Sequence, residues 1–184
     1  MLDTYVLPVS PDEPTTVAES LALLEHELDE VPDAVFPGLS GQPPELDPWE
    51  VINILEVDMH AGRLKGFAGY VGGFPAALCL VGALAAFGPG ASTTAGRVPT
   101  VACLLVAPRY QRLGLGRVLL AEAERALRAK GVTFVDAYPP KPRPGKEAGL
   151  LATFLQAGFV QVGEAGDRLL VRKTLGTTRA RKVG

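Results

Sequence analysis

The sequence predicts an α/β (α+β) fold with a mixed central sheet of about six or seven strands and helices on both faces. Two observations carry this prediction. Helical patterns separate several of the strand patterns but not all of them, which favours a mixed sheet. The segment Val101–Val106 is wholly apolar, as is typical of a central strand covered on both faces. The 184 residues suffice for one domain with a sizeable core.

The N-terminal third contains three predicted elements. Thr4–Val9 carries β-branched and aromatic residues and is predicted as a strand. Thr15–Val31 has apolar residues at three- and four-residue spacing, which indicates a helix. Asp47–Arg63 shows the same spacing, although its segment Val51–Val57 is also rich in the β-branched residues that favour a strand. We interpret this third segment as a helix with Asp47 available as its N-cap residue.

The rest of the chain predicts alternating strands and helices. A β-hairpin is expected around the Gly72–Gly73 turn, with strands at Gly66–Val71 and Ala76–Phe87. The strongest helical pattern of the chain covers Gly114–Lys130. The other predicted elements are strands at Arg97–Val106, Val132–Ala137, Phe159–Val162 and Arg168–Lys173, and a helix at Glu147–Ala157. We expect one domain over residues 1–176 and a flexible basic tail at 177–184.

Composition excludes several classes of protein. A net charge of −2 gives no electrostatic footprint for nucleic acid. The longest apolar segment, Phe74–Phe87, is too short to span a membrane, and no signal peptide is evident. Cys79 and Cys103 are expected to be buried, reduced thiols, which indicates a cytoplasmic protein. The scattered histidines and cysteines show no metal-ligand spacing, so no metal is expected.

The stretch Val101–Arg117 contains the residues that most clearly indicate a ligand-binding site. A buried strand leads through a short loop into a long helix, and a helix N-terminus has free N–H groups and a partial positive charge that bind phosphate. Gly114 and Gly116 have no β-carbon, so a diphosphate can approach the backbone closely. Arg112 and Arg117 can reach phosphate oxygens. This pattern predicts a phosphate-binding loop.

Two common nucleotide motifs are incomplete in this loop. The dinucleotide fingerprint requires a third glycine, but Leu119 stands at its position. The loop also contains no Gly-Lys-Ser/Thr tripeptide of the kind that binds nucleoside triphosphates. A nucleotide-dependent enzyme is therefore disfavoured.

The run Val106–Leu120 closely resembles the acetyl-CoA motif of the GNAT acetyltransferase superfamily. Gln111, Gly114 and Gly116 stand in register with that motif, which follows a strand ending in Val-x-Pro. The family's second motif is similar to Phe154–Phe159, which reads Phe-Leu-Gln-Ala-Gly-Phe at the end of a predicted helix. The resemblance covers roughly residues 66–175 and implies the GNAT fold with a splayed central strand pair.

The resemblance implies acetyl-CoA as co-substrate. The family holds the CoA diphosphate with loop amides, which correspond here to Arg112, Leu113, Gly114, Leu115, Gly116 and Arg117. In the family a bulge splays the central strand from its neighbour, and pantetheine pairs with the exposed strand edge. That edge corresponds to the backbone of Leu104, Leu105 and Val106, which agrees with the tendency of unpaired strand groups to find partners.

The implied reaction is transfer of an acetyl group to a primary amine by direct attack on the thioester. An N–H of Leu105 or Val106 is the expected oxyanion donor. The acceptor, a small-molecule or peptide amine, is not revealed by the sequence, and family members are commonly monomers or homodimers. A non-catalytic acyl-CoA-binding module is the alternative.

The catalytic residues are less well defined. Many family members place a tyrosine general acid where this chain has Phe154, so Tyr138 is a substitute candidate, with a rim aromatic or water as alternatives. Asp136 is a candidate base that can equally anchor the proline-rich loop Pro139–Gly145. Glu147 is a second candidate base that can equally be a helix-start residue. The prolines make the loop Pro139–Gly145 stiff and extended.

Overall fold

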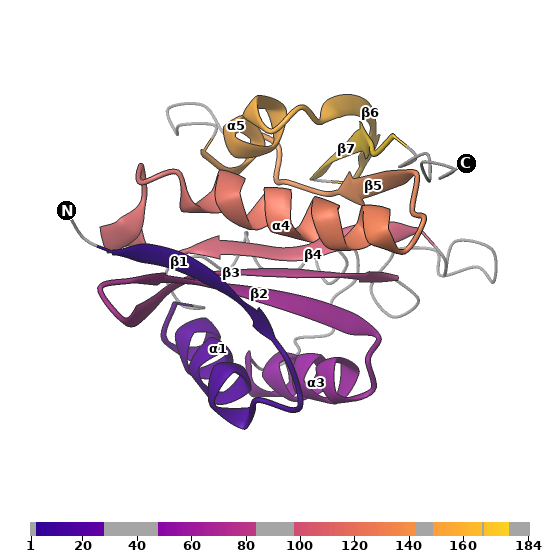
Figure 1. Ribbon diagram of the computed structural model, residues 1–184. Coiled ribbons are helices and arrows are strands. Elements are labelled where there is room, and N and C mark those ends of the chain that lie inside the picture. Colours follow the sequence, from indigo (N-terminus) through magenta and orange to yellow (C-terminus); the bar gives the residue numbers. More distant parts are fainter. Residues whose placement is uncertain (1–2, 28–47, 84–97, 143–148, 167, 177–184) are drawn as a thin grey trace, which may run out of the picture.

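The computed structural model describes residues 3–27, 48–83, 98–142, 149–166 and 168–176. Within them lies a seven-stranded sheet in the order β1-β2-β3-β4-β5-β7-β6 (Figure 1). The strands are β1 (Thr4–Val9), β2 (Leu64–Val71), β3 (Phe74–Ala83), β4 (Pro99–Val106), β5 (Phe134–Ala137), β6 (Val160–Ala165) and β7 (Arg168–Thr174). Only the β4–β5 pair among them is parallel, so the predicted mixed sheet is confirmed.

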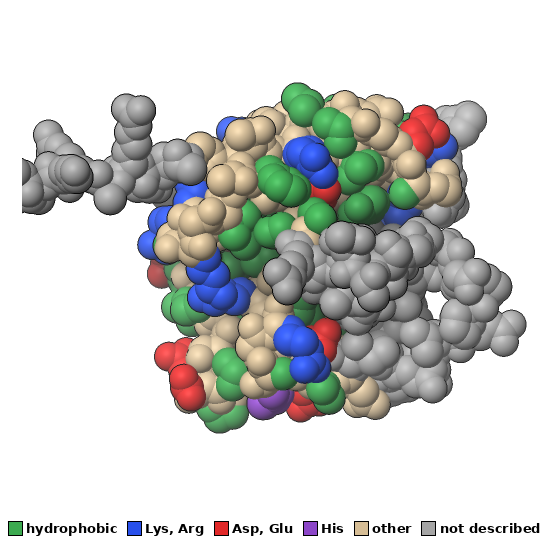
Figure 2. All heavy atoms as spheres, turned by 90° about the vertical axis from the view of Figure 1, so that its right-hand side faces the viewer, with side chains coloured by type: hydrophobic (Ala, Val, Ile, Leu, Met, Phe, Trp, Pro, Cys, Tyr) green, Lys and Arg blue, Asp and Glu red, His purple; other side chains and the backbone are tan. Residues whose placement is uncertain are grey.

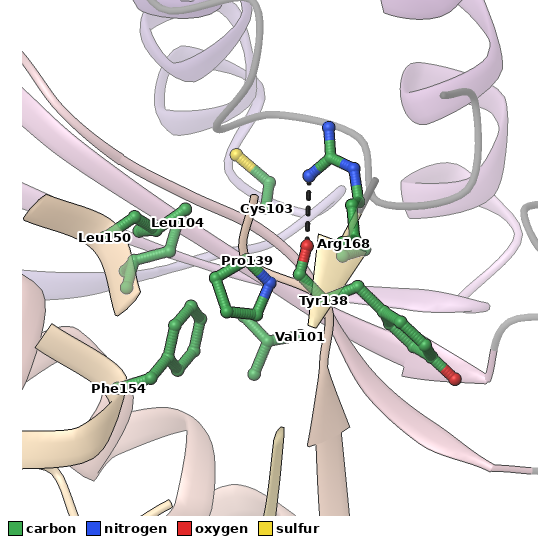
Figure 3. A pocket seen from close by; sticks show the side chains of 9 residues that line it. Val101, Cys103, Leu104, Tyr138, Pro139, Leu150, Phe154 and Arg168 are labelled. Atoms are coloured by element: carbon green, nitrogen blue, oxygen red, sulfur yellow. Dashed lines mark hydrogen bonds between the residues drawn. The ribbon is translucent and has the colours of Figure 1, made fainter. Parts of the chain in front are cut away.

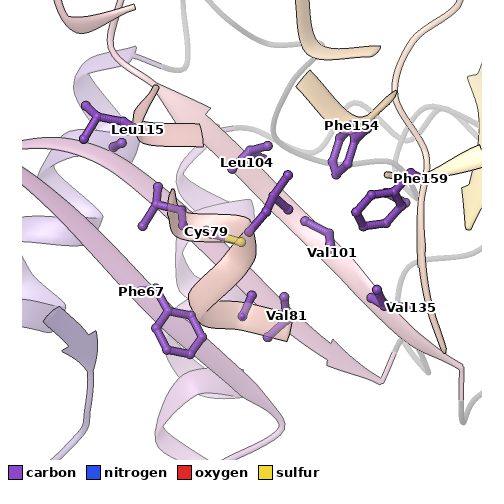
Figure 4. Packing of buried hydrophobic residues seen from close by; sticks show 14 of the residues in the cluster. Phe67, Cys79, Val81, Val101, Leu104, Leu115, Val135, Phe154 and Phe159 are labelled. Carbon is purple, nitrogen blue, oxygen red and sulfur yellow. The ribbon is translucent and has the colours of Figure 1, made fainter. Parts of the chain in front are cut away.

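Helices cover both faces of the sheet, as expected (Figure 1). On one face, α1 (Pro14–Glu27) and α3 (Pro48–His60) enclose a core cluster with β1 to β4. On the other face, α4 (Leu115–Ala129) and α5 (Gly149–Gln156) enclose a second cluster, shown in Figure 4. The ambiguous segment is therefore helical over Pro48–His60, because tertiary packing of Leu55 and Met59 outweighs its β-branched content. Asp47, the expected N-cap residue, lies outside the described residues.

Two predicted strands begin later than expected, and helix capping explains both differences. Val132 donates its N–H to Leu127 O at the end of α4, and Phe159 donates to Phe154 O at the end of α5. In each case the preceding glycine has a positive φ, 75° at Gly131 and 89° at Gly158. These are Schellman caps, so Val132 and Phe159 belong to the helix ends rather than to the strands.

Several predicted regions lie outside the described residues. They include the extensions at 28–31 and 84–87, the start of the helix predicted from Glu147, and the tail 177–184. The extent of the domain over 1–176 stays a prediction. No helix in the described parts of the chain is long and apolar enough to cross a membrane.

A buried charge network fixes α4 and α5 to the sheet. Glu124 on α4 is 5% exposed and accepts from Lys173 Nζ at 2.6 Å and Arg128 Nη2 at 3.0 Å. Lys173 also donates to the carbonyl of Ala157, just after α5. A buried carboxylate needs such partners, and here they join α4, β7 and the end of α5.

Candidate active site

Strands β4 and β5 separate after two residue pairs. Thr100 pairs with Asp136 and Val101 with Ala137, whereas β4 continues to Val106 without this neighbour. The register of β4 against β3 shifts at the same point, which makes Ala102 a bulged residue. A bulge bends its strand and interrupts pairing. The splayed central strand pair implied by the family resemblance is thus present.

The hydrogen-bond alternation of β4 shows which backbone groups face the gap. Ala107 donates its N–H to Ala76 O on the β3 side at 2.9 Å. Because antiparallel neighbours alternate between bonded and non-bonded pairs, Leu105 also bonds toward β3. The N–H and C=O groups of Leu104 and Val106 therefore point into the gap. Of the two expected oxyanion donors, this alternation favours Val106 over Leu105.

A pocket lies where the two strands part (Figure 3). It contains about 210 Å³ of empty space, including its open mouth. Leu104 and Phe154 line it from the α4/α5 side, and Cys103 lines it from the α1/α3 side. Residues of both core clusters therefore contribute to its wall.

The glycine loop follows β4 through a short 3-10 helix, η1 (Pro108–Tyr110). Gly114 has a φ of 80° and caps α4, and Arg112 is the one non-glycine residue of the described chain with a positive φ, 66°. A β-carbon on Gly114 would meet no atom within 4 Å, so the space beside its Cα is open. The loop is held to β4 by Gln111, whose Nε2 donates to Val106 O at 3.4 Å.

The loop amides are available to a ligand. On one side of the loop, the N–H of Gln111 donates to Pro108 O. On the other side, the N–H groups of Arg117 and Val118 donate to Gly114 O in the first turn of α4. Within the described part of the chain, the N–H groups of residues 112–116 donate to no backbone carbonyl. Leu115 and Gly116 open α4, at whose N-terminus the helix dipole favours an anion.

Asp136 is committed to an ion pair. Its carboxylate is 2% exposed and accepts from Arg172 Nε at 2.6 Å and Nη2 at 2.7 Å. The Arg172 guanidinium also lies over the Phe134 ring, 4.4 Å from its centre. Such a bidentate pair favours a structural role for Asp136 over that of a free base. The ion pair joins β5 to β7. Anchoring of the loop Pro139–Gly145 by Asp136 stays a prediction.

Tyr138 follows β5, and its phenol points away from Phe154 and Leu104 (Figure 3). Burial raises the pKa of Tyr138, the charge of Asp136 raises it further, and the charge of Arg172 lowers it. The phenol is therefore protonated at neutral pH. The structure places the residue beside the pocket but does not direct its hydroxyl into it.

Phe154 occupies the pocket wall that the resemblance assigns to an acid. It is 2% exposed and packs edge-to-face on Phe159, with ring centres 5.0 Å apart (Figure 4). Phe154 has no proton to give. Glu147, the other candidate base, lies outside the described residues and stays a prediction.

Sequence reasoning missed two arginines on β7. Arg168 is 3% exposed, lines the pocket and donates from Nη1 to Tyr138 O at 3.0 Å. Arg172 is the partner of Asp136. The only signal was their place on either side of the apolar run Leu169–Val171, where a charge that becomes buried needs a partner. On the face seen in Figure 2, Lys and Arg side chains are scattered among hydrophobic and acidic ones.

Comparisons with known proteins agree with this geometry. The model of the Acetyltransferase (GNAT) family matches residues 28–142. The chain therefore belongs to the GNAT acetyltransferase family. No curated protein matches the chain.

Many solved structures share the fold. They include yncA from Salmonella typhimurium with its cofactor acetyl-CoA, at 17% identity and a TM-score of 0.64, covering 98% of this chain and 99% of that one. The paia N-acetyltransferase of Thermoplasma acidophilum, in complex with coenzyme A, has 11% identity, a TM-score of 0.62 and coverages of 94% and 99%. The ribosomal-protein-S18-alanine N-acetyltransferase of Escherichia coli has 16% identity, a TM-score of 0.60 and coverages of 97% and 98%.

Proposed function

We propose that this protein transfers an acetyl group from acetyl-CoA to a primary amine of a small molecule or peptide. One observation carries the proposal. An open glycine loop with free amides and a splayed strand edge with free backbone groups meet at the C-terminal end of β4. The first fits a diphosphate and the second fits a peptide-like arm. The two solved relatives that contain coenzyme A or acetyl-CoA support this choice of ligand.

The residues present fit coenzyme A. The open space beside Gly114 and the amides of residues 112–116 accommodate the diphosphate at the positive end of α4. Arg112 and Arg117 are exposed on the loop and the first helical turn, where their charges favour phosphate. The backbone of Leu104 and the N–H of Val106 offer edge groups to the amides of pantetheine, while Val106 O accepts from Gln111. When bound, acetyl-CoA supplies the reactive thioester.

Three tasks fall to the protein in this reaction. The Val106 N–H, directed into the gap, stabilises negative charge on the carbonyl oxygen under attack. Tyr138 returns a proton to the departing thiolate, through water or after rotation of its side chain. Glu147 stays the candidate base that keeps the amine neutral.

The acceptor class, the cellular compartment and the assembly belong to the same proposal. The Escherichia coli relative is named for a ribosomal-protein alanine, which makes a peptide amine a reasonable acceptor alongside polyamines, amino acids and amine-bearing antibiotics. Cys79 and Cys103 are free and buried, which agrees with a reducing cytoplasm. We expect a monomer or homodimer that requires no metal.

A second candidate, a non-catalytic acyl-CoA-binding module, is favoured by one observation. Phe154 fills the position of the usual acid with a buried ring, and Asp136, the candidate base among the described residues, is paired with Arg172. A protein with this arrangement can bind acyl-CoA without turning it over. Turnover is therefore the property that separates the two candidates.

The experiment is a thiol-release assay with acetyl-CoA and a panel of amines, run beside a binding measurement. Release of free CoA that depends on one amine class, together with the acetylated product by mass spectrometry, would support the enzyme. Binding without release on any amine would favour the module. No binding would contradict both.

A further inference from the structure

The chain after β5 is directed away from β4 by its own residues. If the parallel register of Thr100 with Asp136 and Val101 with Ala137 continued, Cys103 would face Pro139 and Leu104 would face Pro140. Proline has no N–H and cannot donate to a strand ladder. Because Leu169 donates to Pro139 O, Pro139 faces β7, and Pro140 stands at the position where β5 would otherwise donate toward β4. Pro139 cannot donate toward β7 either.

The carbonyl groups of the same segment are also taken, and by β7. Arg168 Nη1 donates to Tyr138 O at 3.0 Å, and Leu169 N donates to Pro139 O at 2.9 Å. Pro140 forms an isolated bridge with Arg168. Figure 3 shows the Arg168 guanidinium bonded to the Tyr138 carbonyl at the edge of the pocket. The segment is thus bonded to β7 at Pro139 O, and Tyr138 O already accepts from the Arg168 guanidinium.

We propose that Arg168, with the Pro139–Pro140 pair, forms a latch that holds the β4–β5 gap open before a ligand enters. Arg168 is then a positioning residue: it acts on the Tyr138–Pro140 segment and leaves the Leu104 edge free. The effect of the latch on cofactor affinity rests on the acetyl-CoA site proposed above. The effect of the latch on the backbone edge of β4 is independent of that site and can be measured without any ligand.

The physical reason for a latch is the cost of an unpaired edge. Leu104 is 3% exposed, and its N–H and C=O point into the gap. Such groups gain by pairing with any available backbone. A segment free to turn toward β4 would satisfy them and narrow the gap, so a ligand would have to displace it. Fixing the segment on β7 removes this competition and preorganises the site.

The test compares Arg168→Met with Arg168→Lys and with Arg128→Met. Met keeps the bulk of Arg168 without its donors, whereas Lys can still donate to Tyr138 O. Arg128→Met is the matched control, because it removes an arginine from an ion pair far along α4 while Lys173 still pairs with Glu124. Two readouts are used: acetyl-CoA affinity by calorimetry, and amide hydrogen exchange in the ligand-free protein.

The exchange readout has an internal control. The N–H of Leu105 bonds toward β3, so it exchanges slowly in every folded variant, whereas that of Leu104 faces the gap. We expect Arg168→Met to slow exchange at Leu104 at least about tenfold and to weaken acetyl-CoA affinity about tenfold, the worth of one charged hydrogen bond. Arg168→Lys should stay within about threefold of the wild type, and Arg128→Met should change neither readout.

The outcomes separate the latch from the proposed function. If the wild type binds acetyl-CoA and Arg168→Met changes neither Leu104 exchange nor affinity, the latch is wrong. If the wild type binds no acetyl-CoA, the proposed function fails and Leu104 exchange alone decides on the latch. Should Arg168→Met not fold, the double variant Pro139→Ala/Pro140→Ala restores two N–H groups and must slow Leu104 exchange. Unchanged exchange in that variant would overturn the proposal.

Discussion

Gly116 on α4 lies directly against Thr153 on α5. A β-carbon on Gly116 would lie 3.1 Å from Thr153 Cγ2, closer than nearly all real contacts of this kind. The absence of a side chain at residue 116 therefore lets α5 approach the start of α4 and the pocket wall that it carries. Gly116 thus permits a close helix pair beside the loop expected to bind phosphate.

Gly116→Ala should therefore be rescued by a change on the other helix. We expect the alanine variant to lose about 1–2 kcal/mol of unfolding free energy through overpacking. Thr153→Ser removes the opposing methyl group and keeps the hydroxyl that donates to Gly149 O. The double variant should recover most of the loss in denaturant unfolding. If the changes in unfolding free energy of the two single variants simply added in the double variant, this contact would not set the helix spacing.

A negative charge introduced at residue 114 should weaken binding of the CoA diphosphate. Asp and Asn have the same size, and both tolerate a positive φ and cap a helix, so Gly114→Asp and Gly114→Asn should both fold. Only Asp places a negative charge beside the expected diphosphate. We expect acetyl-CoA affinity to fall at least about tenfold further in the Asp variant than in the Asn variant, because 1.4 kcal/mol of repulsion suffices.

Affinity measured by calorimetry checks this prediction for Gly114. An equal loss of acetyl-CoA affinity in the Asp and Asn variants would assign the effect to backbone strain. Retained affinity in both would place the cofactor elsewhere.

Tyr138→Phe should lower kcat by about tenfold to a hundredfold and leave acetyl-CoA affinity unchanged, if Tyr138 is the acid. Because burial raises its pKa above the ordinary value of 10.0, the wild-type kcat should stay level through neutral pH. It should decline only above about pH 10, where a phenol loses its proton. Steady-state kinetics across pH test this. Identical kinetics and pH profiles for the two proteins would remove Tyr138 from the mechanism.

Asp136 and Arg172 should behave as a structural pair. Arg172→Met leaves a carboxylate that is 2% exposed without its partner, and should cost about 3 kcal/mol of unfolding free energy. Adding Asp136→Asn should restore most of this stability, as chemical denaturation can show. A large loss of kcat in Asp136→Asn with unchanged stability would instead assign Asp136 the role of the base.

The protein should lose stability in alkaline solution because of its buried thiols. Burial raises the pKa of Cys103 from 9.0 to about 12 and raises that of Cys79 as well. Below pH 9 both states hold these protons, so the thiols cause no pH dependence. Between pH 9 and 12 the unfolded chain releases them and the folded chain does not, which favours unfolding by about 1.4 kcal/mol per pH unit for each thiol.

Cys103→Ala should reduce that alkaline slope, whatever it does to stability at pH 7. Urea midpoints from pH 7 to pH 11 provide the measurement. A slope unchanged in this variant would contradict the buried state of the thiol.

Local pattern explains which parts of the fold were predictable. The helix at α4 and the buried strand β4 follow from apolar spacing within a few residues, and the glycine loop between them follows from two residues without side chains. Asp136 and Arg172 meet across β5 and β7 from positions 36 residues apart. No local spacing encodes that pairing, so the sequence left the role of Asp136 open.

The sequence also could not predict the direction in which a side chain points. Tyr138 was expected near the thiol site because it follows β5, and it does line the pocket. Its phenol points elsewhere because the segment after Ala137 is bonded to β7 through Arg168 and Leu169. That tertiary bonding also explains why Arg168, predicted only as a strand residue, lies at the pocket.

The central claim is that the glycine loop and the splayed edge of β4 together bind acetyl-CoA. Calorimetric titration of the wild-type protein with acetyl-CoA, with ATP and NAD as controls, tests it most directly. We predict micromolar binding of acetyl-CoA and no comparable binding of either nucleotide. Absence of acetyl-CoA binding, or tighter binding of ATP, would contradict the claim.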